Sequence, residues 1–275
     1  MQSAASDLPL LEAAAREAGA YAQVWFGRPR EIMSKGALGP VTDVDLAIDR
    51  MLADKLRAAR PDYGWLSEET PDTPERLKHE RIFSLDPIDG TAAYIEGLAQ
   101  YTISIGVVEH GHAVAGAIFN PATNEMFLGA PGAGATLNGA PIRASATARI
   151  EDAHLLGEKR RYDAKRWAQP WPTGLRVTSR LSIAYRLALV ASGQYDATIL
   201  FGPKNEWDIA AGAAIVEGAG GRFTDPWGDA IAFNRPEPRA PSGAVAAGVA
   251  MHALIIERTA QFARPNLGEG AGQAS

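Results

Sequence analysis

The sequence predicts an α+β protein whose two halves are built differently. Apolar residues recur at helical spacing in two N-terminal segments, 7–25 and 43–59. Between residues 101 and 141, short apolar runs separated by turn sequences are typical of antiparallel strands. Later in the chain, strand and helix patterns alternate, as they do in α/β sheets. We therefore expect an antiparallel half over residues 1–148 and an α/β half over residues 149–263.

Each element of the first half has a local signal. Asp7 is expected to cap the first helix, Asp43 to open the second, and Pro61 to end it. A short strand is expected over Ile82–Leu85. The remaining expected elements are strands at Tyr101–Glu109, Ala113–Phe119 and Glu125–Gly129, with turns at His110-Gly111, Pro121–Asn124 and Asn138-Gly139.

The second half is expected to contain strands and helices in turn. The strands are Ala153–Leu156, Leu175–Thr178, Ala197–Phe201 and Ala244–Ala247, and the helices are Leu181–Ser192, Asp208–Gly218 and Met251–Phe262. Residues 264–275 are rich in Gly and Ala and are expected to form a disordered tail.

Composition excludes several classes of protein. The chain has 275 residues, of which 46% are hydrophobic, as expected for a globular domain with a sizeable core. It contains no Cys, which rules out disulfides and thiol nucleophiles and fits a cytoplasmic protein. A net charge of −5 argues against long nucleic acids as partners, and no apolar run is long enough to span a membrane. A small phosphorylated substrate remains compatible, because bound metal reverses the local charge.

The most informative stretch runs from Leu85 to Thr91. Asp86 and Asp89 lie three residues apart, and burying an unpaired carboxylate is costly. Pro87 restricts the backbone of Asp86 to extended geometry, which aims both carboxylates at one point and exposes the Ile88 carbonyl as a third oxygen. Because Mg²⁺ binds through a few carboxylates together with substrate phosphate, this pattern predicts a metal site.

The next two residues suit an anion. Gly90 lets the backbone approach a ligand closely, and Thr91 can open a helix whose free N–H groups favour negative charge. Oxygen ligands beside such a helix start indicate phosphate chemistry.

Three other acidic segments have ordinary interpretations when each is taken alone. Ser67–Thr70 is typical of a solvated acidic turn, Pro40–Asp45 of a helix cap, and Asn205–Gly212 of another helix start. Beside the Asp86–Asp89 run, each becomes a candidate source of ligands.

Together the four segments resemble the Mg²⁺-dependent, lithium-sensitive phosphomonoesterase superfamily that includes the inositol monophosphatases. The family pattern contains V-T-x-x-D, E-E, D-P-[IL]-D-G-T and W-D-x-A-A-G, and the resemblance covers about residues 8–260. It implies a single phosphatase domain over residues 1–275, folded as a layered α/β/α/β/α sandwich of the inositol monophosphatase and fructose-1,6-bisphosphatase type. Homodimers are common in the family.

The resemblance also implies roles for individual residues. Two or three Mg²⁺ ions would be held by Glu69, Asp86, the Ile88 carbonyl, Asp89 and Asp208. Asp45 and Thr91 would orient the attacking water, with Glu69 sharing a weaker third ion. Asp89, Gly90 and Thr91 would hold the phosphate. The mechanism implied is direct in-line hydrolysis with no phosphoenzyme.

The sequence indicates the substrate less clearly than it indicates the metal site. Where inositol monophosphatases usually carry Glu, this chain has Phe201, and its F-G-P-x-N-x-W-D segment resembles the branch that hydrolyses adenosine 3′,5′-bisphosphate. An aromatic ring at this position could stack on a base. The candidate basic contacts are Lys35, Lys159, Arg180 and Lys204, and Leu181 replaces a family Gly beside them.

Two alternatives stay open. If Phe201 is a core residue and the basic groups are surface charges, inositol-1-phosphate or a similar sugar phosphate becomes the expected substrate. The other alternative is a non-catalytic regulator with the same fold, which a degraded metal site would have favoured.

The ligand assignment predicts that Asp89→Asn abolishes turnover while the protein still folds. The substitution removes a ligand charge and very little packing volume. Steady-state kinetics with circular dichroism on the same preparation would check it, and a retained kcat would contradict the metal assignment.

Overall fold

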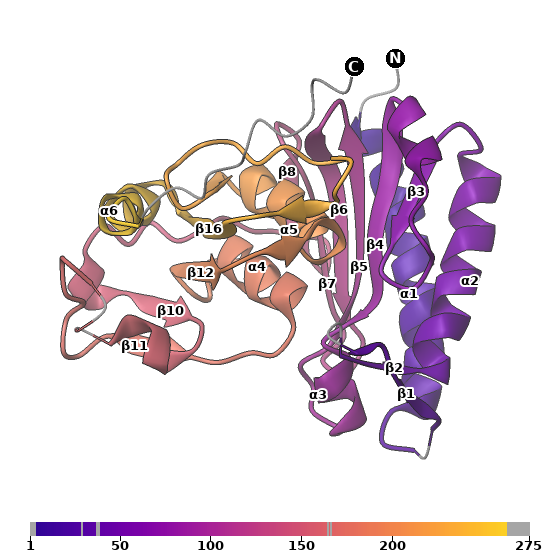
Figure 1. Ribbon diagram of the computed structural model, residues 1–275, viewed down its shortest axis with the longest axis horizontal. Helices are drawn as coiled ribbons and strands as arrows, with labels where there is room; N and C mark the ends of the chain where they lie inside the picture. Colours follow the sequence, from indigo (N-terminus) through magenta and orange to yellow (C-terminus); the bar gives the residue numbers. More distant parts are fainter. Residues whose placement is uncertain (1–3, 29, 37–38, 164, 166, 263–275) are drawn as a thin grey trace, which may run out of the picture.

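The computed structural model describes residues 4–28, 30–36, 39–163, 165 and 167–262, and these form five layers (Figure 1). Two helices cover a seven-stranded sheet, two more helices separate it from a five-stranded sheet, and a last helix covers the far side of that sheet. The layered sandwich expected from the sequence is therefore confirmed. The predicted tail at 264–275 lies outside the described residues.

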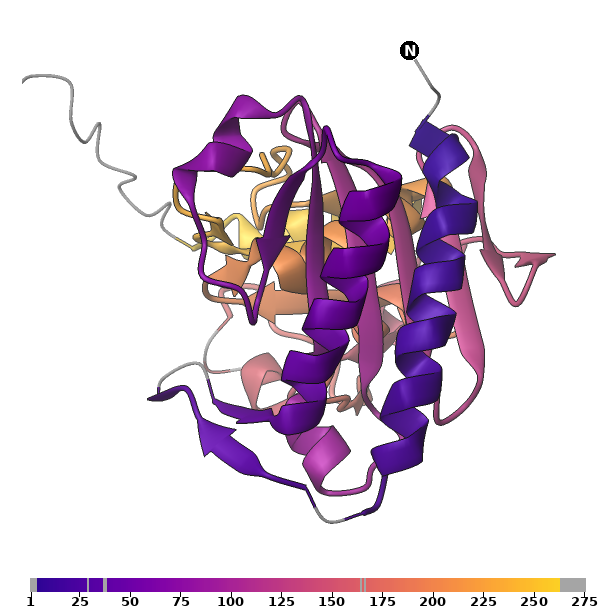
Figure 2. The ribbon, with the colours of Figure 1, turned by 90° about the vertical axis from the view of Figure 1, so that its right-hand side faces the viewer.

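The first layer consists of α1 (Leu8–Trp25) and α2 (Asp43–Ala59), which lie side by side over the sheet (Figure 2). Asp7 precedes α1, but its side chain makes no capping bond. Its fully buried carboxylate instead accepts hydrogen bonds from Arg60 Nε and Tyr63 Oη, both at 2.9 Å. The expected side-chain capping bond is therefore absent. The Asp7 carboxylate instead connects α1 to the chain after α2.

Helix α2 begins at Asp43, as expected. Thr42 is its N-cap, and the Thr42 hydroxyl accepts from the Asp45 N–H at 3.3 Å. The Asp45 carboxylate accepts in return from the Thr42 N–H at 2.9 Å, which completes a capping box. Asp45 is therefore held rigidly at the start of α2 with no exposed surface.

The seven-stranded sheet follows chain order, with every neighbouring pair antiparallel except the first. The turns at His110-Gly111 and Asn138-Gly139 are confirmed, and all four residues have positive φ. The strands are β3 (Gly64–Ser67), β4 (Arg81–Asp89), β5 (Thr102–Glu109), β6 (His112–Asn120), β7 (Glu125–Ala130), β8 (Gly134–Leu137) and β9 (Ala140–Pro141). The parallel strand β3 was not anticipated, since four residues carry too little periodicity to reveal it.

The second sheet has the strand order β11-β10-β12-β16-β14 and is mixed. Successive residues of β16 face opposite layers: Ala244 and Ala246 pack with the middle helices, and Val245 with the outer helix α6. Its strands are β10 (His154–Leu156), β11 (Arg176–Thr178), β12 (Ala197–Phe201), β14 (Gly221–Thr224) and β16 (Gly243–Gly248). The other elements are α6 (Val249–Thr259), α3 (Thr91–Ile95), β1 (Ile32–Ser34), β2 (Pro40–Thr42), β13 (Lys204–Asn205) and β15 (Arg239–Ala240).

The middle layer holds α4 (Ile183–Ala191) and α5 (Glu206–Gly218). Helix α5 lies very close to the seven-stranded sheet because glycines on β5, β6 and β7 leave room for its backbone. A Cβ added at Gly116 would lie 2.2 Å from the Ala211 carbonyl oxygen, which is backbone and cannot rotate away. This close approach fixes how far the start of α5 lies from β4.

We expect Gly116→Ala to lower the free energy of unfolding by about 1–3 kcal/mol, the usual cost of overpacking a tight core. Gly174→Ala is the matched control, since a Cβ there meets nothing within 4 Å and its φ is not positive. The control should be neutral or slightly stabilising. Urea unfolding of both variants checks this, and equal stabilities would show that α5 can move away from the sheet at no cost.

Candidate active site

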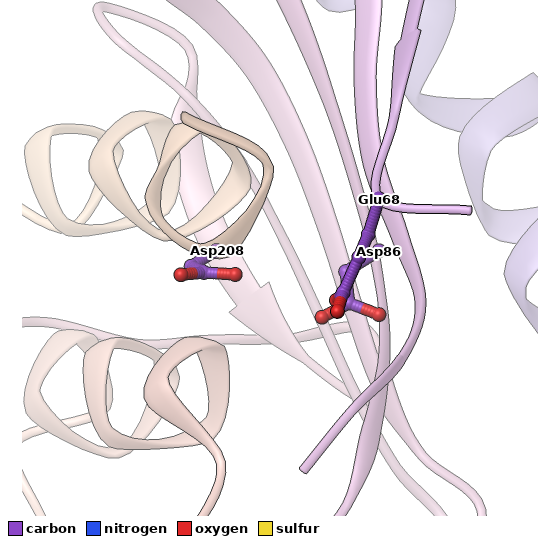
Figure 3. A group of neighbouring side chains, drawn as sticks. All are labelled: Glu68, Asp86 and Asp208. Carbon is purple, nitrogen blue, oxygen red and sulfur yellow. The ribbon is translucent and has the colours of Figure 1, made fainter. Parts of the chain in front are cut away.

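Three carboxylates converge where the two halves of the chain meet. Oxygens of Glu68, Asp86 and Asp208 lie within 4.8 Å of one another (Figure 3). Glu68 follows β3, Asp86 lies on β4, and Asp208 is in the first turn of α5. Asp86 is only 2% exposed, so its charge is poorly solvated. Such a cluster of oxygen donors fits a hard divalent cation.

The cluster contains Glu68, where the sequence-based assignment placed Glu69. The Glu69 carboxylate lies 2.8 Å from Lys35 Nζ, which also lies 2.6 Å from Glu68. Burial alone would lower the pKa of Lys35, but its bonds with the two glutamates raise it overall. The choice between the neighbouring glutamates therefore needs correcting in favour of Glu68.

Strand alternation explains the correction. Leu66 packs with the helices of the middle layer and Trp65 with the outer pair, so the two faces of β3 alternate. Glu68 continues the strand, since its N–H bonds the Leu85 carbonyl at 3.2 Å. It therefore shares the face of Leu66, toward Asp208, and the parallel register brings it beside Asp86. The signal was present in the sequence, but it required recognising β3.

Asp49 anchors the segment that carries both glutamates. Its carboxylate accepts from the Ser67 hydroxyl at 2.5 Å and from the Thr70 hydroxyl at 2.6 Å. These two residues flank Glu68 and Glu69, so α2 holds the segment at both ends. Asp49 was not predicted as part of the site; its spacing of one helical turn from Asp45 was the available signal.

The Asp86–Asp89 run breaks the regular pairing of β4 with β5, whose register shifts between these two residues. The strand continues to Asp89 instead of ending at Leu85 as expected. Asp86 Oδ1 accepts from the Ile88 N–H at 2.9 Å, which closes a local turn around the proline. Because the pairing is irregular here, neighbouring residues of the Asp86–Asp89 run can face the acidic cluster together.

Thr91 lies between Asp45 and the Asp86–Asp89 run. Its hydroxyl oxygen is 3.1 Å from Asp45 Oδ1 and 3.0 Å from the Ile88 carbonyl oxygen. It is the first residue of α3, and Gly90 before it has φ 93°. A side chain at Gly90 would be strained in this region and would also meet the Gln100 carbonyl at 2.9 Å.

Asp89 is held by helix α4. Its Oδ2 accepts from the Ser182 hydroxyl and, at 2.7 Å, from the Ala184 N–H. Burial raises the pKa of Asp89 to about 6, although these hydrogen bonds act in the opposite direction. The second half of the chain therefore orients one of the two carboxylates that the first half supplies.

The site carries more negative charge than the protein around it neutralises. Burial, reinforced by the neighbouring carboxylates, raises the pKa of both Asp86 and Asp208 well above the usual range. Burial also raises the pKa of Glu69 to about 7, against the pull of Lys35. A bound divalent cation would remove this repulsion, so the residues present fit a metal. Protons and metal would compete for the site near neutral pH.

The predicted substrate contacts divide into two groups. Phe201 and Lys204 line a cavity of about 230 Å³, whereas Lys159 is exposed and lies outside that lining. Arg180 also lies outside it, and its guanidinium donates to the Ser179 carbonyl and the Tyr195 hydroxyl. Lys35 instead lies against the glutamates of the acidic cluster.

Two basic residues in this cavity were missed. Arg161 and Arg186 line it together with Leu181, whose side chain is 44% exposed. Helical spacing along 181–192 could have indicated Arg186, which follows Ser182 by one turn.

Comparison with known proteins gives consistent results. The model of the Inositol monophosphatase family matches residues 5–263. The chain is 33% identical over 227 residues to the 3′(2′),5′-bisphosphate nucleotidase CysQ of Escherichia coli strain K12, covering 81% of this chain and 92% of that protein. It is also 33% identical over 223 residues to the fructose-1,6-bisphosphatase/inositol-1-monophosphatase of Thermotoga maritima, covering 80% and 85%.

The fold agrees with solved structures as well. The extragenic suppressor protein suhB of Bartonella henselae superposes with a TM-score of 0.80 at 25% identity, covering 94% of this chain and all of that one. Fold and acidic cluster together define a metal-dependent phosphomonoesterase. The chain belongs to the inositol monophosphatase family.

No helix in the described part of the chain is both long and apolar enough to cross a membrane. The cytoplasmic location and the homodimer stay predictions.

Glu68→Gln and Glu69→Gln remove the same charge at neighbouring positions and test the ligand assignment. Losing even an outer partner of a metal ligand costs about 10–100-fold in metal affinity. We expect Glu68→Gln to lower Mg²⁺ affinity at least that much, and Glu69→Gln to lower it less. The Mg²⁺ concentration that gives half-maximal kcat measures both effects. A larger loss in Glu69→Gln would restore the original assignment.

Proposed function

We propose that the protein hydrolyses adenosine 3′,5′-bisphosphate to AMP and phosphate. The observation that carries this proposal is the cavity beside the acidic cluster, because it combines an aromatic side chain, Phe201, with basic groups. A nucleotide with two phosphates presents matching chemistry. The similarity to CysQ over most of its length supports the same substrate.

Five groups of this chain would hold the metal ions: the carboxylates of Glu68, Asp86, Asp89 and Asp208, and the Ile88 carbonyl. When bound, divalent cations lower the pKa of a nucleophilic water and stabilise the leaving oxygen. The N–H groups of Gly90 and Thr91 would orient the phosphate at the start of α3.

Asp45 and Thr91 would handle the proton of the attacking water. The Thr91 hydroxyl donates to Asp45 Oδ1, which leaves a lone pair on Oγ1 to accept from the water. Burial raises the pKa of Asp45, so its carboxylate is a stronger base than an exposed one. The capping box holds Asp45 still, so this geometry needs no rearrangement before reaction.

Inositol-1-phosphate is the second candidate substrate, and one observation favours it. The Phe201 ring packs edgewise against Tyr162 and Trp167, as a core side chain does, and the Arg161 guanidinium lies 5.6 Å from its centre. Less of the ring is free to stack on a base than the sequence suggested. The name of the T. maritima relative agrees with this alternative. The intact acidic cluster does not favour a purely regulatory role.

The two substrates are compared by kcat/KM with Mg²⁺ on one preparation. We expect the nucleotide to be preferred by more than about a hundredfold, or about 2.7 kcal/mol of transition-state discrimination. The opposite preference would mean that Phe201 is only a core residue and that the enzyme acts on a polyol phosphate.

A further inference from the structure

Glu206 is a buried carboxylate that lies next to the acidic cluster but outside it. It is the first residue of α5, two residues before Asp208, and it has no exposed surface. Residues two apart on a helix point to nearly opposite sides, so Glu206 faces away from the cluster that Asp208 joins. Among the described residues, no basic nitrogen lies within 4 Å of its carboxylate. Because an unpaired buried charge is costly, hydrogen bonds must hold it.

The Glu206 carboxylate holds the 234–238 segment, which lies between β14 and β15. Its Oε2 accepts from the Asn234 N–H at 2.6 Å, and its Oε1 accepts from the Arg235 N–H at 3.1 Å. The Glu206 N–H donates in turn to the Pro238 carbonyl at 3.0 Å. Strand β13, directly before α5, also pairs with β15, directly after the segment. The start of α5 is therefore tied to this segment at several points.

Arg76 holds the other side of the same segment. Its guanidinium donates to the side-chain carbonyl of Asn234 at 2.6 Å and to the Arg235 backbone carbonyl at 2.7 Å. It also donates to both carboxylate oxygens of Asp72, at 2.6 and 2.9 Å. The Arg76 side chain is only 1% exposed, so water competes little for these bonds.

These contacts connect Arg76 with the part of the chain that carries Glu68. Asp72 follows Glu68 by four residues. On the other side, Arg76 lies directly against β3, the strand that leads to Glu68. A Cβ added at Gly64 of that strand would lie 3.2 Å from both Cα and Cβ of Arg76. Arg76 is thus fixed to the chain both before and after Glu68.

We call Glu206, Asn234, Arg235 and Arg76 the bridge, because together they join α5 to the β3 side of the molecule. Asn234 has a φ of 55°, a left-handed conformation that Asn tolerates better than most residues. In this conformation its N–H reaches Glu206 while its side chain reaches Arg76. The bridge therefore spans the two halves of the chain through a single residue.

The acidic cluster places a load on this connection. Asp208 lies on the helix side of the site, and Glu68 and Asp86 lie on the sheet side (Figure 3). Their carboxylates repel one another, which favours separation of α5 from the sheet. The bridge opposes that separation from the side of α5 that faces away from the cluster.

We propose that Arg76 and Glu206 are positioning residues for the metal site. By holding the start of α5 against β3, they keep Asp208 close to Glu68 and Asp86. Losing either residue then lowers metal affinity, although neither is among the proposed ligands. This inference rests on the metal site proposed above and does not depend on the identity of the substrate.

Arg76→Gln and Glu206→Gln remove opposite charges, which separates positioning from simple electrostatics. If charge alone mattered, loss of the cation would raise Mg²⁺ affinity and loss of the carboxylate would lower it. Positioning instead predicts that both variants bind Mg²⁺ about 10–100-fold more weakly than wild type, the range for losing an outer partner of a metal ligand. Calorimetric titration with Mg²⁺ alone measures this without turnover. An Arg76→Gln variant with wild-type or higher affinity would overturn the proposal.

Asp7→Asn is the matched control for a general loss of stability. Asp7 is as fully buried as Glu206 and also accepts two hydrogen bonds. It lies 3.8 Å from Arg81, which begins β4, whereas Asp89 of the site ends that strand. We expect this variant to lower the free energy of unfolding, measured with urea, and to leave Mg²⁺ affinity unchanged. An equal loss of Mg²⁺ affinity in the control would overturn the positioning role.

Asn234→Gly keeps the proposal testable if the charge variants fail to fold. Glycine adopts this φ without strain and retains the N–H that bonds Glu206, but it removes the side-chain bond to Arg76. No charge changes. We expect Mg²⁺ affinity to fall about 2–10-fold, the equivalent of one hydrogen bond. A folded glycine variant with unchanged affinity would contradict the bridge.

The same titration distinguishes the two ways in which the inference can fail. Wild-type protein that binds no Mg²⁺ would overturn the metal site and, with it, the positioning role. Wild-type binding together with unchanged affinity in the bridge variants would overturn the positioning role alone and leave the metal site standing.

Discussion

The structure depends on bringing several carboxylates together in a poorly solvated place. Glu68, Asp86 and Asp208 approach within 4.8 Å of one another, and burial with mutual repulsion raises the pKa of Asp86 and Asp208. This arrangement opposes folding until a cation is bound, so the rest of the protein must hold the groups in place. Metal binding and the integrity of the site are therefore thermodynamically linked.

The surrounding layers supply that constraint from three sides. Asp49 of α2 holds the segment around Glu68, and the N-terminal end of α4 donates hydrogen bonds to the Asp89 carboxylate. Helix α5, which carries Asp208, is pressed against the sheet at Gly116, where a side chain would clash with its backbone. Each of these three helices thus contributes one fixed component, and the same α4 that orients Asp89 also presents Arg186 to the cavity lined by Phe201 and Lys204.

Much of this was predictable, and the errors have physical causes. The long helices, the hairpins and the Asp86–Asp89 run have strong local signals, and the structure places them close to their predicted bounds. Asp7 is the N-cap residue of α1 as predicted, but its side chain makes no capping bond because its carboxylate is buried beside Arg60 and Tyr63, which is a long-range contact. Glu69 was chosen over Glu68 because the facing of a residue depends on strand register, and β3 is too short to show its own period.

By itself, the sequence determined the residue types, the spacing of the acidic segments and the family, because metal and phosphate chemistry need particular side chains in a local order. Only the tertiary structure decided which glutamate joins the cluster, that Asp49 anchors it, and which basic residues share a pocket. These outcomes depend on contacts between segments far apart in the chain. Such contacts are set by strand register and helix packing, which no local pattern of residues encodes.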